Sequence, residues 1–176
     1  MKGWRLWLPL LGIALLLGLF ALQLARPKDE FVRSALVGQP LPAFALEAQV
    51  PGKHGLANTD FADGRARLLN VFASWCVPCA AEAPQLAALR AGGAEIVAVA
   101  IRDKPSDVAA FLDAYGDPFT RIGADPYSQL QIALGSSGVP ETFVIDGQGI
   151  IRHQHIGDIR ARDVPLLLEQ LAEAGE

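Results

Sequence analysis

The stretch LLNVFASWCVPCAAEAP spans residues 68–84 and contains the only two cysteines of the chain, Cys76 and Cys79. The apolar run before the cysteines, broken by Asn70, is typical of a strand buried on both faces of a sheet. Residues 79–93 have the apolar spacing of a helix that ends at two glycines. The cysteine pair is therefore predicted to lie between a buried strand and a helix.

Strand and helix patterns alternate outward from this stretch. The predicted elements are an early hairpin within 42–60, strands at 67–74, 94–101 and 119–123, helices at 79–93, 104–116 and 125–135, a β-hairpin of 141–146 and 150–156, and a last helix at 163–175. Ser106 is the expected N-cap of helix 104–116, and Gly116 its expected end. The order β-α-β-α-β-α-β-β-α predicts an α/β sandwich with a mixed sheet.

The N-terminal region predicts one transmembrane helix, because Gln23 is the only polar side chain between residues 6 and 25. Twenty helical residues rise about 30 Å, which matches the hydrocarbon core of a bilayer. A cleaved signal peptide would have a shorter apolar part, and the segment LQLAR is a poor cleavage site. The expected organisation is an N-terminus at 1–5, an anchor at 6–25, a linker at 26–40 and a domain at 41–176.

Composition limits the partners. The 176 residues carry a net charge of -4 and no basic run, which argues against a nucleic-acid partner. Basic residues flank both ends of the predicted anchor, so charge alone does not set its orientation. The sequence suggests no cofactor pocket, and no cofactor is predicted.

The cysteine pair has four alternatives to thiol–disulfide exchange. A structural zinc site needs four ligands, and the addition of His153 and His155 fits no standard spacing, although a Cys₂His₂ or copper site stays open. Haem attachment needs a histidine directly after the second cysteine, where the chain has Ala80. A structural disulfide over two residues would remove little chain entropy. The Pro-x-x-x-Thr/Ser-x-x-Cys motif of thiol peroxidases is absent, because Leu69 and Ala73 stand at its key positions.

Thiol–disulfide exchange fits the position of the pair. Cys76 is expected at the N-terminus of the helix, where unpaired backbone N–H groups and the helix dipole favour a thiolate. Cys76 is then the attacking nucleophile, and Cys79, one turn later, is the resolving thiol that closes the disulfide. Pro78 fits the first helical turn, where its missing N–H has no helical partner to lose.

Two segments together carry a resemblance to a known family. LLNVFASWCVPCAAEAP (68–84) and GVPETFVIDGQGIIRHQHIGD (138–158), with the predicted anchor, resemble the membrane-anchored, thioredoxin-like proteins of cytochrome c maturation, the CcmG/DsbE family. The resemblance covers nearly all of the chain. It implies a thioredoxin-like sandwich with a mixed central sheet, an inserted α/β segment and one N-terminal transmembrane helix.

The resemblance also implies roles for residues around the cysteines. Pro84 corresponds to the proline that kinks the active-site helix. Pro140 corresponds to a cis-proline facing the disulfide, so that the backbone of Val139 can pair with a substrate peptide. Trp75, next to the first cysteine, is expected among the substrate-binding residues. Metal ligands are not implied.

Three acidic residues are expected near the pair. Glu82 corresponds to an acid that makes the site electronegative, disfavours the thiolate and relays protons. Glu141 and Asp158 are expected to add to this acidic rim and to bind substrate, although Asp158 could instead cap the last helix. Classical thioredoxins carry a buried aspartate where this chain has Asn70, which cannot shuttle a proton, so Glu82 is the expected agent.

The implied function is a protein-disulfide reductase of the bacterial periplasm. Its expected substrate is the Cys-x-x-Cys-His of apocytochrome c, reached directly or through a companion thiol protein. A membrane protein that relays electrons from cytosolic thioredoxin is the expected donor. The N-terminus would then be cytoplasmic and the domain would lie on the periplasmic side of the inner membrane.

Three alternatives remain at this stage. A related anchored reductase could serve another periplasmic client, such as a copper-site protein. A metal-binding module could use Cys76, Cys79, His153 and His155. An oxidase would carry the same motif and differ in its reduction potential. The segment 101–104 departs from the Tyr-Lys-Asp-type stretch of the family, so partner choice is the least transferable inference.

Overall fold

The computed structural model describes residues 12–13, 15–20 and 35–176. The chain divides into two compact units, Met1–Phe31 and Val32–Glu176. In the first unit, 12–13 and 15–20 are helical. The predicted anchor at 6–25 lies largely outside the described residues, and within those residues no helix has the length and apolar character needed to cross a membrane.

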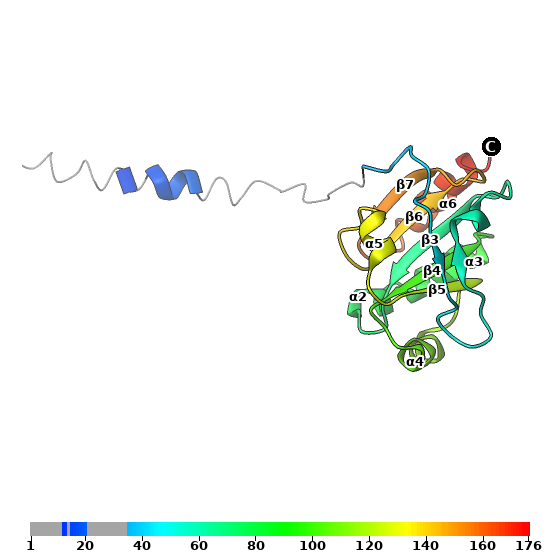
Figure 1. The fold of residues 1–176 in the computed structure, drawn as a ribbon. Helices are drawn as coiled ribbons and strands as arrows, with labels where there is room; N and C mark the ends of the chain where they lie inside the picture. Colours follow the sequence, from blue (N-terminus) through cyan, green and yellow to red (C-terminus); the bar gives the residue numbers. More distant parts are fainter. Residues whose placement is uncertain (1–11, 14, 21–34) are drawn as a thin grey trace, which may run out of the picture. The chain divides into compact units, whose positions relative to one another are not determined.

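The second unit is built on a five-stranded sheet in the order β5-β4-β3-β6-β7 (Figure 1). The strands are β3 (Arg67–Phe72), β4 (Ile96–Ile101), β5 (Arg121–Asp125), β6 (Glu141–Ile145) and β7 (Ile151–Ile156). β3, β4 and β5 are parallel, whereas β6 runs antiparallel to β3, and β7 antiparallel to β6. The predicted mixed sheet is therefore confirmed, and β3 and β4 are buried along their whole length.

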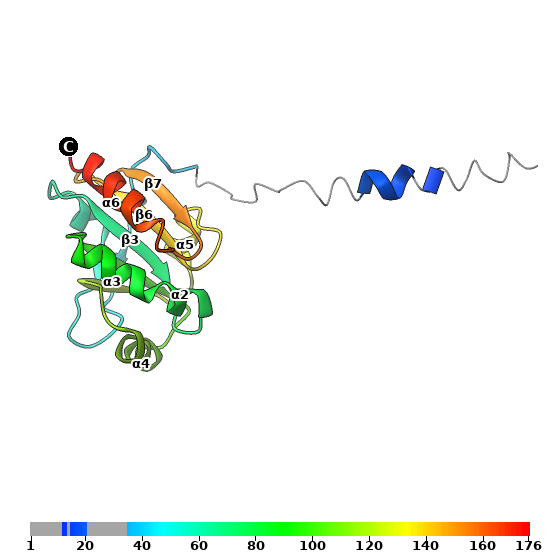
Figure 2. The same cartoon turned by 180° about the vertical axis from the view of Figure 1, so that it is seen from behind.

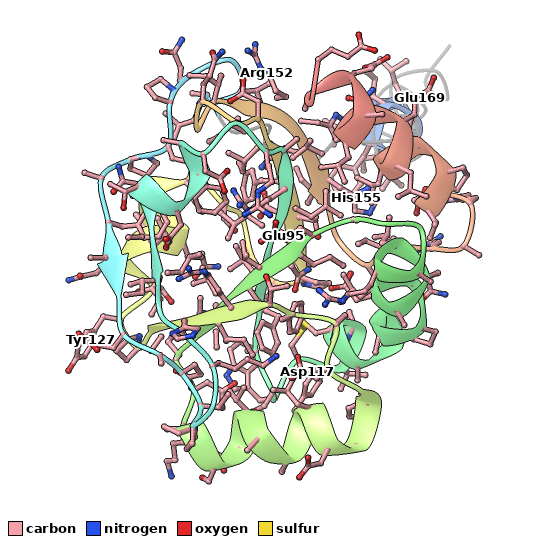
Figure 3. The ribbon with its side chains drawn as sticks, turned by 90° about the vertical axis from the view of Figure 1, so that its right-hand side faces the viewer. Glu95, Asp117, Tyr127, Arg152, His155 and Glu169 are labelled. Atoms are coloured by element: carbon pink, nitrogen blue, oxygen red, sulfur yellow. A yellow bond between two sulfur atoms is a disulfide. The ribbon has the colours of Figure 1, made fainter. Side chains whose placement is uncertain are left out.

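Helices cover both faces of this sheet. α3 (Ala83–Ala91) and α6 (Val164–Glu173) pack side by side on one face (Figure 2). α5 (Gln129–Ala133) and the short antiparallel pair β1 (Ala45–Leu46) and β2 (Leu56–Ala57) lie on the other side (Figure 3). The early hairpin is thus present as two-residue strands, followed by the 3₁₀ turn η1 (Asn58–Phe61).

The helix that carries the cysteines is interrupted. α2 (Val77–Ala81) ends before Glu82, and α3 starts at Ala83 with Pro84 in its first turn. A proline lacks the N–H that would continue the helical ladder, so it breaks the single helix predicted over 79–93.

Two other helix boundaries differ from the prediction. α4 (Pro105–Tyr115) has Lys104 at its N-cap because Pro105 occupies the first position, so Ser106 is not the cap. Gly116 ends this helix as predicted, with φ +94°. α5 begins only at Gln129, later than the predicted start at 125, because residue 125 still belongs to β5.

The sheet brings three segments together at one end of its strands, the C-terminal end of β3 and β4. β3 and β4 are parallel, so the residues after them, from Ala73 and from Arg102 onward, emerge at the same end. β6 is antiparallel, so its first residue, Glu141, pairs with Val71 at that end of β3. The cysteine loop, the loop after β4 and the segment that precedes β6 therefore lie at the same end of the sheet, which we call the active-site end.

Candidate active site

The cysteines form a disulfide at the start of α2. Cys76 is the N-cap residue, and its Sγ accepts a hydrogen bond of 3.2 Å from the backbone N–H of Cys79. Both cysteines are nearly buried, with 5% and 2% of their surface exposed, whereas Val77 between them is 80% exposed. The two sulfurs are therefore largely covered, whereas the residue that directly follows Cys76 is open to solvent.

Glu82, the C-cap residue of α2, carries a fully buried carboxyl group. Its oxygens accept hydrogen bonds from Asn70 Nδ2 and from the backbone N–H of Ile159, each at 3.0 Å. Burial raises the pKa of Glu82 to about 7, and the negative charge of Asp158 raises it further, while the two hydrogen bonds oppose the shift. Glu82 is therefore not a solvated surface charge but a group that changes its charge near neutral pH.

Asn70 connects Glu82 to the sheet. Its Nδ2 also donates to Thr142 Oγ1 on β6 at 3.0 Å, whereas its Oδ1 has no hydrogen-bond partner among the described residues. Asn70, Cys79 and Glu82 line one small cavity of about 10 Å³, roughly the space of a single water molecule. The resolving cysteine, the amide and the titrating carboxyl group thus border the same space.

The Val139–Pro140 peptide bond is cis, and Pro140 is buried. Glu141 follows it and is also fully buried, which corrects the expectation that this residue belongs to an exposed acidic rim. Its carboxylate accepts hydrogen bonds from Ser136 Oγ at 2.6 Å, from Ser137 N at 3.0 Å and from the amide of Gln154. Glu141 therefore fastens the loop that leads to Pro140 instead of facing a client.

Asp158 is half-exposed and lies beside Arg160, with 3.5 Å between the carboxylate and Arg160 Nε. It does not cap the last helix, because α6 begins after Asp163. The expected acidic rim is thus reduced to one partly neutralised carboxylate.

The two histidines of β7 do not join the cysteines. His155 lies on β7 (Figure 3). Its Nε2 is 3.4 Å from the backbone oxygen of Asp158. Across the part of the chain that the structure describes, no group of three or more His, Cys, Asp or Glu side chains is arranged to hold a metal ion. The alternative of a metal site built from both cysteines and both histidines therefore has no support in the geometry.

Comparisons with known proteins agree with this site. The model of the Redoxin family matches residues 36–171. The chain is 41% identical to the thiol:disulfide interchange protein HelX of Rhodobacter capsulatus over 83% of this chain and 82% of that protein. It is 39% identical to DsbE of Yersinia pestis over 89% of this chain and 86% of that protein.

The chain belongs to the DsbE/HelX family of thiol:disulfide interchange proteins. A crystal structure of a putative DsbE from Chlorobium tepidum is 30% identical, has a TM-score of 0.68 and covers 80% of this chain and 98% of that one. The fold is accordingly thioredoxin-like, and thiol–disulfide oxidoreduction is the activity of this DsbE/HelX protein.

Sequence reasoning missed two residues that touch the active-site loop of this DsbE/HelX protein. Asp103, after β4, accepts hydrogen bonds from the backbone N–H of Ser74 at 2.5 Å and from Ser74 Oγ at 2.7 Å. The carbonyl oxygen of Arg102 accepts a hydrogen bond of 3.3 Å from Trp75 Nε1. The departure at 101–104 was visible in the sequence, but only the parallel pairing of β3 with β4 shows that it adjoins the cysteines.

Proposed function

We propose that this DsbE/HelX protein is a periplasmic protein-disulfide reductase, anchored through residues 6–25. The observation that carries the proposal is the buried Glu82 carboxyl group bordering the same cavity as Cys79. An ionised carboxylate next to the pair disfavours a thiolate. Strong oxidants of this fold have a high reduction potential because their reduced form is stabilised. Because Glu82 disfavours the thiolate of the reduced form, it should lower the reduction potential and favour a reductant.

The reaction begins with the dithiol form. The Cys76 thiolate attacks one sulfur of a client disulfide, forms a mixed disulfide with it and releases the other client sulfur as a thiolate. Cys79 then loses its proton and attacks Cys76 Sγ. This step forms the Cys76–Cys79 bond, breaks the bond to the client and leaves the client as a dithiol. Two electrons pass to the client, and the protein ends in the oxidised form.

Glu82 is proposed to take the proton that Cys79 loses. A base near neutral pKa is best matched to proton transfer at neutral pH, and the pKa of Glu82 is raised to about 7 by burial. In a Glu82→Gln variant the pH profile of Cys79 reactivity, measured by alkylation rate, should shift. An unchanged profile would remove Glu82 from this role.

The proposed client is the oxidised Cys-x-x-Cys-His segment of apocytochrome c, reached directly or through a companion thiol protein. The resemblance to cytochrome c maturation proteins supports this choice, and Ala80 after Cys79 excludes this chain itself as a c-type cytochrome at that motif. A membrane protein that passes on electrons from cytosolic thioredoxin would restore the dithiol. A copper-site protein is the second candidate client of the same chemistry.

The client is tested with peptides. The full chain, purified in detergent and reduced, is mixed with an oxidised Cys-x-x-Cys-His peptide, and free thiols are counted by mass after alkylation. The expected result is reduction of one peptide disulfide per protein. Reduction of a general protein disulfide but not of this peptide would contradict the client, and no exchange with either would contradict the function.

A further inference from the structure

Arg102 has an unusual backbone conformation at the active-site end of the sheet. It directly follows β4 and has a φ of +46°, in the left-handed region that residues other than glycine rarely adopt. Its backbone N–H donates to the carbonyl oxygen of Asp125 at 3.2 Å, which holds this conformation. Strained backbone of this kind persists where the surroundings determine it, and it concentrates at functional sites.

The strained conformation attaches Arg102 to the residue that precedes Cys76. Its carbonyl oxygen receives Trp75 Nε1–H, and its guanidinium carbon lies 5.6 Å from the centroid of the Trp75 ring. A guanidinium at this distance from an aromatic face is attracted by the ring and loses part of its rotational freedom. The cation is therefore held against the side chain of the residue that directly precedes Cys76.

The nearby carboxylates are all engaged elsewhere. Glu82 and Glu141 are buried and hydrogen-bonded, and both oxygens of Asp103 bind Ser74. Two further carboxylates, Asp125 and Asp158, are also occupied. Asp125 accepts hydrogen bonds from the backbone N–H groups of Gln129 and Gln131, and Asp158 lies beside Arg160. Among the described residues no carboxylate pairs with the exposed Arg102 side chain, so its donors are open to solvent.

We propose that Arg102 is a specificity-determining residue that binds a carboxylate of the client next to the disulfide under attack. The planar guanidinium offers paired N–H donors that match a carboxylate, and its contact with Trp75 reduces the entropy lost on binding. The preferred clients are therefore disulfides flanked by aspartate or glutamate. This inference rests on the proposed reductase function and specifies its substrate class.

A purely supporting role is the rival explanation. Arg102 could orient Trp75, or its charge could stabilise the Cys76 thiolate, without touching the client. Either role would change the rate with every disulfide by the same factor. Client recognition changes only the ratio of rates between an acidic and a neutral client, so this ratio separates the explanations.

The test uses the full chain in detergent with two oxidised Cys-x-x-Cys-His peptides that differ only in Glu or Gln at the flanking positions. The measured quantity is kcat/KM for the Glu peptide divided by kcat/KM for the Gln peptide. Arg102→Gln should lower this ratio about two- to fivefold at low ionic strength, the range expected for an exposed ion pair. Arg102→Lys should retain part of the ratio, and high salt should reduce the effect.

Lys104→Gln is the matched control, because it removes an exposed positive charge two residues away, and the hydrogen bond and the cation–π contact of Trp75 both involve Arg102. It should leave the wild-type ratio unchanged. If wild type and Arg102→Gln have the same ratio of kcat/KM values, the inference is overturned. It is also overturned if Arg102→Gln and Lys104→Gln lower this ratio by the same factor. If the wild-type protein reduces neither peptide but still reduces a general protein disulfide, the proposed client and this inference are both overturned. If it reduces none of the three, the proposed reductase function is overturned as well.

Discussion

Replacing Glu82 with glutamine is expected to change how the stability of the domain depends on pH. The carboxyl group is fully buried, and its pKa is raised from 4.5 to about 7, chiefly by burial. The folded protein therefore binds a proton that the unfolded chain releases between these two values. In wild type this group stabilises the fold fully below pH 4.5, and its contribution is lost as pH rises through about 7.

The size of the effect follows from the pKa. A shift from 4.5 to about 7 corresponds to roughly 3 kcal/mol between the two protonation states. Glutamine has the same shape and no charge. Its oxygen can accept from Ile159 N–H, and its amide can donate to Asn70 Oδ1, which has no partner among the described residues, once the Asn70 amide turns over. The free energy of unfolding of Glu82→Gln should therefore rise relative to wild type by about 3 kcal/mol between pH 4.5 and 8.

Urea unfolding of residues 32–176 in the oxidised form provides the assay, because the disulfide prevents the cysteines from titrating. Wild type and variant are measured at half-unit steps from pH 4.5 to 8.5. Other ionisable groups contribute equally to both proteins, so the difference between the two free energies isolates Glu82. Parallel pH profiles, with a difference constant to within about 0.5 kcal/mol, would refute the claim that Glu82 titrates near neutral pH.

Three further substitutions test the rest of the site. Cys79→Ser should trap the client on Cys76 as a stable mixed disulfide, visible as a mass increase that dithiothreitol removes; failure to trap would contradict the assigned order of attack. Glu141→Gln should lower the free energy of unfolding by about 1–3 kcal/mol, because the new amide group faces hydrogen-bond donors; an unaffected urea midpoint would show that the buried carboxylate does not fasten its loop. Asp103→Asn should cost about 1–2 kcal/mol and slow exchange, since one oxygen that binds Ser74 becomes an N–H₂ group, and a wild-type thiol-exchange rate would exclude this residue as a support of the active-site loop.

Local sequence patterns were sufficient to predict an α/β architecture with a mixed sheet, whereas the thioredoxin-like fold was implied by the resemblance. The apolar runs that became β3 and β4 can be accommodated only in a sheet covered on both sides, and the glycine after α4 marks its end. The position of Cys76 at a helix start followed from the same stretch. The apolar spacing of 79–93 predicts one continuous helix, whereas Pro84, which the resemblance gives as a kink, coincides with the break between α2 and α3.

Side-chain burial was harder to predict. Glutamates are usually found at the surface, yet Glu82 and Glu141 are both buried. Glu82 is covered with the loop after β7, where Ile159 donates to it, and Glu141 lies against β7, where Gln154 donates to it. The contact of Asp103 with Ser74 joins residues 29 positions apart, and it depends on the register of β3 with β4. Such contacts leave no periodic signal in the sequence.

The equilibrium reduction potential of the Cys76–Cys79 pair tests the central claim most directly. It is measured by equilibrating the protein with glutathione and dithiothreitol buffers and counting alkylated thiols by mass. A reductant with a buried carboxylate next to Cys79 should have a potential clearly below about -200 mV, nearer to thioredoxin than to DsbA. A potential near about -120 mV would mean that the Cys76 thiolate is strongly stabilised, and it would identify the protein as an oxidase.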